Sequence, residues 1–174
     1  MNRRDLVLGA SGAVLAVNFP HSGPATPRPV QPDDERFMRL ALAEAAQGDF
    51  PFGAVIVRDG DVLAAAFNTG LRDGDPTAHG EMNAIRAVLA GHGAAALAGA
   101  TLYTSGEPCP MCAGAIIWCG IGRVVYAASI AQLATKLDQI MITIEQIAAA
   151  APFAPLELTG GVLSAEAIAL FLKP

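Results

Sequence analysis

Charged and aromatic residues are scarce in this chain of 174 residues, at 16% and 6%. Apolar residues reach 53%, which excludes an intrinsically disordered protein and suffices for one domain with a substantial core. Basic residues do not gather beyond Arg3-Arg4, and the formal net charge is −5, so no nucleic-acid partner is expected. The three cysteines cannot all pair, which argues against a disulfide framework and for a metal or thiol site.

The chain also lacks a long hydrophobic run, because the apolar stretch 6–17 is shorter than the roughly 20 residues that a membrane-spanning helix needs. This stretch follows Arg3-Arg4, which is typical of a twin-arginine export signal. We predict an export signal over 1–25 and a proline-rich tether over 26–32. The mature protein is then periplasmic and has no membrane segment; the alternative is a buried first helix in a cytoplasmic protein.

The export prediction is tested at the two arginines. We expect Arg3→Lys combined with Arg4→Lys to abolish most export, because the adjacent arginines are the feature that such signals present. Cell fractionation measures the share of the chain that leaves the cytoplasm. Unchanged export would show that the twin-arginine interpretation is wrong.

The remainder, residues 33–174, is predicted to be one α/β domain. Apolar periodicity and turn residues predict a central sheet with helices on both faces. The expected strands are 52–58, 62–67, 101–104, 123–127 and 156–158, with a hairpin turn at Asp59-Gly60. The expected helices are 33–47, with Asp33 as N-cap, 79–90, 111–119 and 164–172.

Two short motifs carry chemically useful side chains at predicted helix starts. His79, Cys109 and Cys112 supply one imidazole and two thiolates, three ordinary zinc ligands that leave a fourth position open for water. Cys119 lies about two turns beyond Cys112, too far to bind the same ion, so the pattern favours a catalytic over a structural zinc. Glu81 is suited to moving protons beside the metal. Alternatively, the histidine is a solvated or capping residue and the cysteines are a redox pair.

The phrases DPTAHGE, LYTSGEPCPMCAGAIIW and GRVVYAA, between Phe52 and Ala128, resemble the cytidine deaminase superfamily, in particular its guanine deaminase and tRNA adenosine deaminase branch. The resemblance implies a three-layer α/β/α fold with a mixed sheet of about five strands, one zinc ion per chain and a homodimer. It also implies that Glu81 shuttles protons during hydrolytic loss of ammonia. Asn68 and Trp118 match substrate-binding positions, although an Asn-Thr-Gly turn and a core tryptophan are the plainer interpretations.

The implied substrate is a small nucleobase or nucleoside, and a purine such as guanine is the first expectation. Three features depart from guanine deaminases. Gly80, between His79 and Glu81, makes this motif more similar to that of fungal cytosine deaminase. The Phe-Asp-Asp segment that guanine deaminases carry after the residues matching 126–128 is missing, with only Asp138 nearby, and 158–174 replaces their aromatic C-terminal tail. Cytosine, cytidine or tRNA adenosine therefore remain alternatives. A catalytically silent zinc-binding module and a thiol-redox protein are the alternatives of another class.

Overall fold

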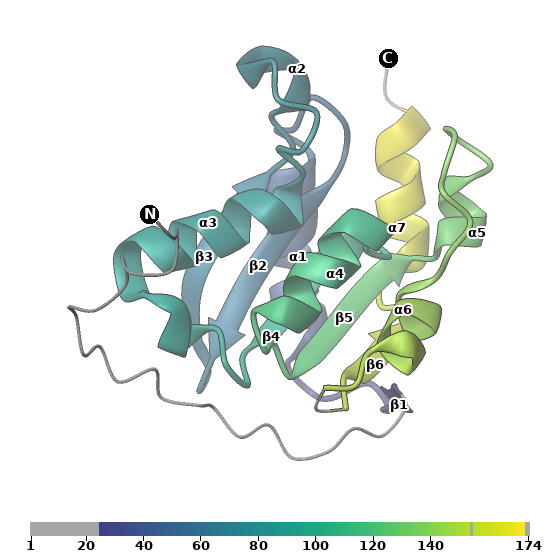
Figure 1. The fold of residues 1–174 in the computed structure, drawn as a ribbon. Coiled ribbons are helices and arrows are strands. Elements are labelled where there is room, and N and C mark those ends of the chain that lie inside the picture. Colours follow the sequence, from purple (N-terminus) through teal and green to yellow (C-terminus); the bar gives the residue numbers. More distant parts are fainter. Residues whose placement is uncertain (1–24, 154, 173–174) are drawn as a thin grey trace, which may run out of the picture.

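The structure is a computed structural model that describes residues 25–153 and 155–172 (Figure 1). Almost all of the predicted export signal, residues 1–24, therefore lies outside the described residues. Within them, no helix is both long enough and apolar enough to cross a membrane.

A mixed six-stranded sheet forms the centre of the domain, in the order β1-β6-β5-β4-β2-β3. Strands β1, β6, β5 and β4 run parallel to one another, whereas β2 pairs antiparallel with both β4 and β3. The predicted turn at Asp59-Gly60 joins β2 to β3, with both residues at positive φ, as a two-residue hairpin turn of this kind requires. The strands are β1 (Thr26–Pro27), β2 (Gly53–Arg58), β3 (Asp61–Phe67), β4 (Thr101–Gly106), β5 (Arg123–Ala128) and β6 (Glu157–Gly160).

Helices cover both faces of this sheet, so the predicted three-layer α/β/α architecture is confirmed. Helices α1 (Asp34–Ala45) and α7 (Ser164–Ala169) bury one face, with Met38 and Val55 in that core, and the 3₁₀ turn Leu170–Leu172 follows α7. Helices α3 (Gly80–His92), α4 (Pro110–Trp118) and α6 (Ile144–Ala150) bury the opposite face. In Figure 1, α3 and α4 lie in front of the sheet.

Three short helices are absent from the prediction. They are α2 (Gly70–Asp73), α5 (Ile130–Leu133) and α6. Both α5 and α6 start with a capping box, in which the hydroxyl of Ser129 or Thr143 accepts a backbone N–H and the glutamine three residues later accepts the return bond.

The segment before α1 differs from the expected free tether. Ala25 is buried, and Thr26–Pro27 pairs in parallel with β6, where the backbone N–H of Thr26 donates to Leu156 O at 2.9 Å. Arg28 forms an ion pair with Glu157. Among the described residues, packing against the sheet therefore includes 25–28, ahead of α1, because the edge of β6 offers backbone partners that local sequence does not reveal. The domain boundaries themselves stay a prediction.

A buried ion pair links α1 to the sheet. Asp34 is fully buried and accepts two hydrogen bonds from the Arg123 guanidinium, at 2.7 and 2.8 Å, and one from the Tyr103 hydroxyl at 3.1 Å. Arg123 also donates to Thr159 Oγ1. Asp33, expected to cap α1, makes no side-chain capping bond; the backbone N–H of Gln31 donates to Asp34 instead. The carboxylate that ties this helix start to the sheet is thus Asp34 rather than the expected cap, Asp33.

Candidate functional site

Two helix starts meet near the carboxyl ends of strands β4 and β5. His79 is the N-cap of α3, and Cys109 is the N-cap of α4, whose first residue is Pro110. Proline suits this position because its missing N–H would have no partner there. The carboxyl ends of parallel strands are where α/β sheets place their ligands. The predicted motifs are therefore brought together at a location suited to a site.

The three candidate ligands form one cluster. The ligand atoms of His79, Cys109 and Cys112 all lie within 4.8 Å of one another. His79 Nδ1 is 3.7 Å from Cys109 Sγ and 3.6 Å from Cys112 Sγ. Tetrahedral zinc, with Zn–S near 2.3 Å and Zn–N near 2.0 Å, would place nitrogen and sulfur ligands about 3.5 Å apart. The donor set and its spacing therefore fit a zinc ion held by three protein ligands.

The electrostatics of the cysteine pair also suit metal binding. A hydrogen bond from Cys112, together with one from His79, lowers the pKa of Cys109 to about 4 despite burial. The same hydrogen bond between Cys112 and Cys109, together with burial, raises the pKa of the Cys112 thiol. A thiolate is the form of cysteine that binds metal, so one ligand is already prepared for it.

Glu81 is a buried carboxyl at the same helix start. Glu81 is only 5% exposed, and this burial raises the pKa of its carboxyl group above the usual range. It lines the same cavity as His79 and Cys109 without belonging to the three-residue ligand cluster. A carboxyl that is protected from water but close to a metal site can accept and return protons.

Gly80 allows α3 to approach the start of β2. A Cβ atom on Gly80 would lie 2.9 Å from Phe52 O and 3.1 Å from Gly53 Cα, too close for an alanine without a backbone shift. Phe52 in turn lines the cavity and contacts the ring of Phe171 edge-on, with 5.5 Å between centroids. The glycine between His79 and Glu81 is thus a packing requirement of this chain.

A cavity of about 370 Å³ opens over the cluster. Such a volume falls in the range of pockets that hold small molecules. The walls come from four parts of the chain: Phe50, Phe52, Asn68, Pro76, His79, Glu81, Glu107, Cys109, Met111 and 137–140.

The family model for the cytidine and deoxycytidylate deaminase zinc-binding region matches residues 31–128, more than half of the chain, and includes both motifs. The chain belongs to this deaminase family.

Relatives of this deaminase-family chain carry several activities in their names. It is 46% identical over 99 residues to guanine deaminase of Bacillus subtilis, covering 54% of this chain and 64% of that protein. It is 33% identical over 145 residues to a probable cytosine deaminase of Schizosaccharomyces pombe, covering 78% and 88%. A solved structure from a study of A-to-I editing by tRNA:A34 deaminases has 32% identity and a TM-score of 0.68, covering 78% of this chain and 98% of the other. The match to this chain thus covers less than two thirds of the length of the Bacillus subtilis guanine deaminase.

Asn68, one predicted substrate contact, lies in the cavity wall of this deaminase-family site. It is almost fully buried, and its Oδ1 accepts the backbone N–H of Gly70 at 3.1 Å. With that oxygen engaged, the Nδ2 amide is the donor that this side chain can offer to a ligand. Its placement suits substrate binding, which remains a prediction.

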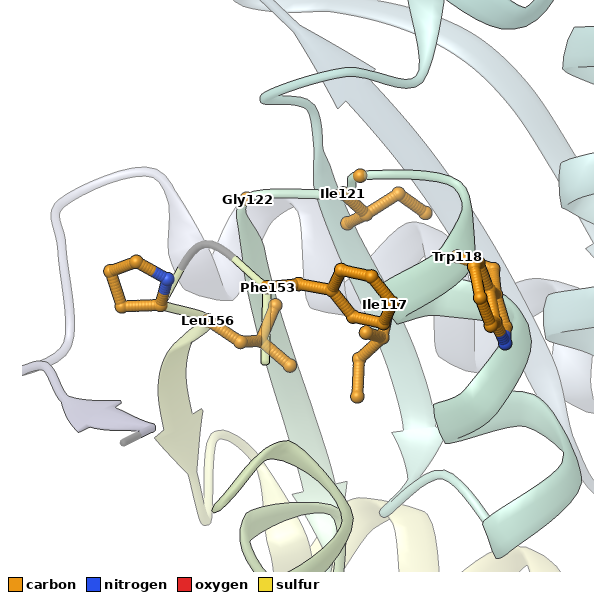
Figure 2. Close-up of a pocket in the computed structure, with 8 residues that line it drawn as sticks. Ile117, Trp118, Ile121, Gly122, Phe153 and Leu156 are labelled. Carbon is orange, nitrogen blue, oxygen red and sulfur yellow. The ribbon is translucent and has the colours of Figure 1, made fainter. Parts of the chain in front are cut away.

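Trp118, the other predicted substrate contact, lies elsewhere (Figure 2). It is 76% exposed at the far end of α4 and contacts the tilted ring of Phe153, with 4.8 Å between ring centroids. It lines a separate apolar pocket of about 100 Å³ with Leu156. Trp118 is the sixth residue after Cys112 on this helix, which places it about 9 Å farther along the helix axis. The structure therefore does not bring Trp118 to the cavity of its own chain.

Glu107 lines the cavity and lies two residues before Cys109, in the second motif, where the sequence alone assigned it no role. Each of its carboxylate oxygens accepts a backbone N–H, from Ile130 and from Ile144. Because both oxygens are engaged, Glu107 is a poor proton carrier, which supports Glu81 for that task. The position just before Pro108 gave no local signal for this arrangement, since its partners lie 23 and 37 residues away.

We expect Cys109→Ala and Cys112→Ala each to reduce bound zinc from one ion per chain to a small fraction of that, because two ligands rarely hold zinc. Cys119→Ala is the matched control, since this half-buried thiol is outside the cluster. Metal analysis of the purified proteins measures the ratio. Full zinc content in Cys112→Ala would show that the ligand set is wrong.

Proposed function

We propose that this protein is a zinc-dependent hydrolytic deaminase of a nucleobase or nucleoside, with a purine such as guanine as the first candidate substrate. One observation carries the proposal: the buried residue Glu81 lines one cavity of small-molecule size together with His79 and Cys109, two members of the cluster that Cys112 completes. A silent zinc-binding module would have no use for a buried carboxyl at this position.

The roles of the side chains follow from their surroundings. His79, Cys109 and Cys112 would hold a zinc ion, which supplies the Lewis acidity that makes water nucleophilic near neutral pH. Glu81 takes a proton from the attacking water and delivers it to the ring nitrogen of the base, then helps ammonia leave. Asn68 Nδ2 donates to an acceptor on the base, and the Asp138 carboxylate, which also lines the cavity, accepts from its N–H groups.

Guanine is favoured by the 46% identity to a guanine deaminase and by a cavity wall that offers both an amide donor and a carboxylate. A tRNA substrate fits poorly with a net charge of −5, because RNA binding depends on basic side chains. Cytosine is the second candidate, since the probable cytosine deaminase aligns over 78% of this chain and Gly80 is the residue that resembles fungal cytosine deaminase. We further propose that the protein acts in the periplasm, as a homodimer.

Ammonia release from the zinc-loaded protein tests the function. The panel comprises guanine, guanosine, adenine, adenosine, cytosine and cytidine, with Glu81→Ala as the blank. We expect turnover of guanine above the others. Turnover of cytosine alone would show that cytosine rather than guanine is the substrate, and the protein would still be a deaminase. No turnover of any base with zinc bound would favour the zinc-binding module.

A further inference from the structure

The segment between α5 and α6 forms one wall of the cavity. Leu137, Asp138, Gln139 and Ile140 from this segment line the cavity, as do His79 and Cys109 of the candidate zinc-ligand cluster. Ile140 and its neighbours Met141 and Ile142 are largely exposed. This wall has few buried anchors of its own, so something else must set its distance from the ligand cluster.

The anchors of this wall lie at its two ends. Ile130 is the first residue of α5 and Ile144 the first residue of α6, and both side chains are buried. The first backbone N–H groups of a helix have no partner within the helix. Here both are satisfied by one side chain: Glu107 Oε2 accepts from Ile130 N at 2.9 Å, and Oε1 accepts from Ile144 N at 3.2 Å.

Glu107 is itself held rigidly beside the metal ligands. It follows β4 directly, its backbone N–H donates to Ala128 O at the end of β5 at 2.7 Å, and Pro108 and Cys109 come next in the chain. The residue is 7% exposed. A single buried carboxylate therefore connects the loop that presents Cys109 to both ends of the wall formed by 137–140.

We propose that Glu107 is a positioning residue that sets the width of the substrate cavity, by holding 137–140 at a fixed distance from the zinc ligands. The proposal rests on the deaminase function for its kinetic consequence. Hydrogen bonds to a charged group are among the stronger ones in proteins. The carboxylate also complements the positive ends of two helix dipoles. Glu107 acts through the wall and leaves proton transfer to Glu81.

The first measurement needs no variant. In the zinc-loaded wild-type protein, amide hydrogen exchange is compared between Ile130 and Ile144 and their next neighbours, Ala131 and Glu145, whose second-position N–H groups have no intrahelical partner. We expect the Ile130 and Ile144 amides to exchange at least about tenfold more slowly. Equal rates within each pair would overturn the proposal.

The second measurement uses Glu107→Gln, which keeps the shape but replaces one of the two acceptor oxygens by an NH2 group, which can donate but cannot accept. We expect unchanged zinc content, at least about tenfold faster exchange at Ile130 or Ile144, and a KM about tenfold higher with kcat within about threefold. KM changes alone because the wall contacts substrate, whereas Glu81 and the metal ligands lie on α3 and α4. Glu145→Gln, an exposed carboxylate of α6, is the control and should change nothing.

Three results would overturn the proposal: loss of zinc in Glu107→Gln, faster exchange without a change in KM, or equal losses in kcat and kcat/KM. The first would mean that Glu107 supports the ligand loop, and the last that it takes part in the chemistry. If the wild-type protein turns over no base, the function proposal fails, while the exchange rates still report whether Glu107 holds the wall.

Discussion

Glu81→Gln is expected to keep one zinc ion per chain and to lose about 10²–10⁴-fold in kcat on the best substrate. The carboxamide has nearly the same shape but cannot accept and return a proton. Because Glu81 is buried, solvent water cannot easily take over its role as proton carrier. Metal analysis and steady-state ammonia release on the same preparation give both numbers.

Glu44→Gln, a carboxylate of α1 outside the cavity, provides the matched control for this loss and should retain wild-type turnover. Loss of zinc in Glu81→Gln would show that the carboxylate helps to hold the metal. Turnover close to wild type would eliminate Glu81 as the proton carrier.

Asp34→Asn is expected to lower the free energy of unfolding by about 3–5 kcal/mol, because it leaves the buried Arg123 guanidinium without its counter-charge. Asp33→Asn removes the adjacent, exposed carboxylate and should change stability by less than about 0.5 kcal/mol. Urea denaturation of the two variants and the wild type measures both differences. Equal stability of the two variants would show that the buried pair adds little.

The same pair predicts a pH dependence of stability. Burial raises the pKa of Asp34, but hydrogen bonds from Arg123, Gln31 and Tyr103 outweigh it and leave the pKa lowered. The ionised carboxylate therefore stabilises the fold fully above its unfolded-state pKa of about 3.9, and this contribution is lost as the pH falls through the lower folded-state value. Asp34→Asn should flatten this acidic limb of the stability curve.

Sequence reasoning reached the parts of this molecule that local patterns determine. The run 52–58 is nearly all apolar because both faces of the sheet are covered, and β2 occupies almost the same residues. The glycine of the Asp59-Gly60 hairpin and the prolines and cysteines at helix starts have equally local causes. The grouping of His79 with Cys109 and Cys112 was likewise visible from their chemistry.

Long-range contacts explain what the sequence did not reveal. Asp34 belongs locally to a polar first turn, and only the fold brings Arg123, 89 residues away, to its carboxylate. Trp118 shares a helix with the ligand Cys112, but the direction of α4 takes it away from the cavity. The helices α5 and α6 are too short for periodicity to show, although the spacing of Ser129 and Thr143 from their glutamines was a signal that could have been used.

The two-residue strand β1 has a consequence for how this protein limits edge-to-edge pairing of its sheet with other molecules. Without it, β6 would end the sheet with a row of unpaired backbone groups, a template on which a second molecule's strand can be added. Thr26–Pro27 covers the first half of that row, at Glu157 and Leu158, and the proline presents no N–H for further pairing. Processing that spares this dipeptide preserves a blunt sheet edge, whereas trimming into it would leave a chain with the same active-site residues and a new tendency to aggregate.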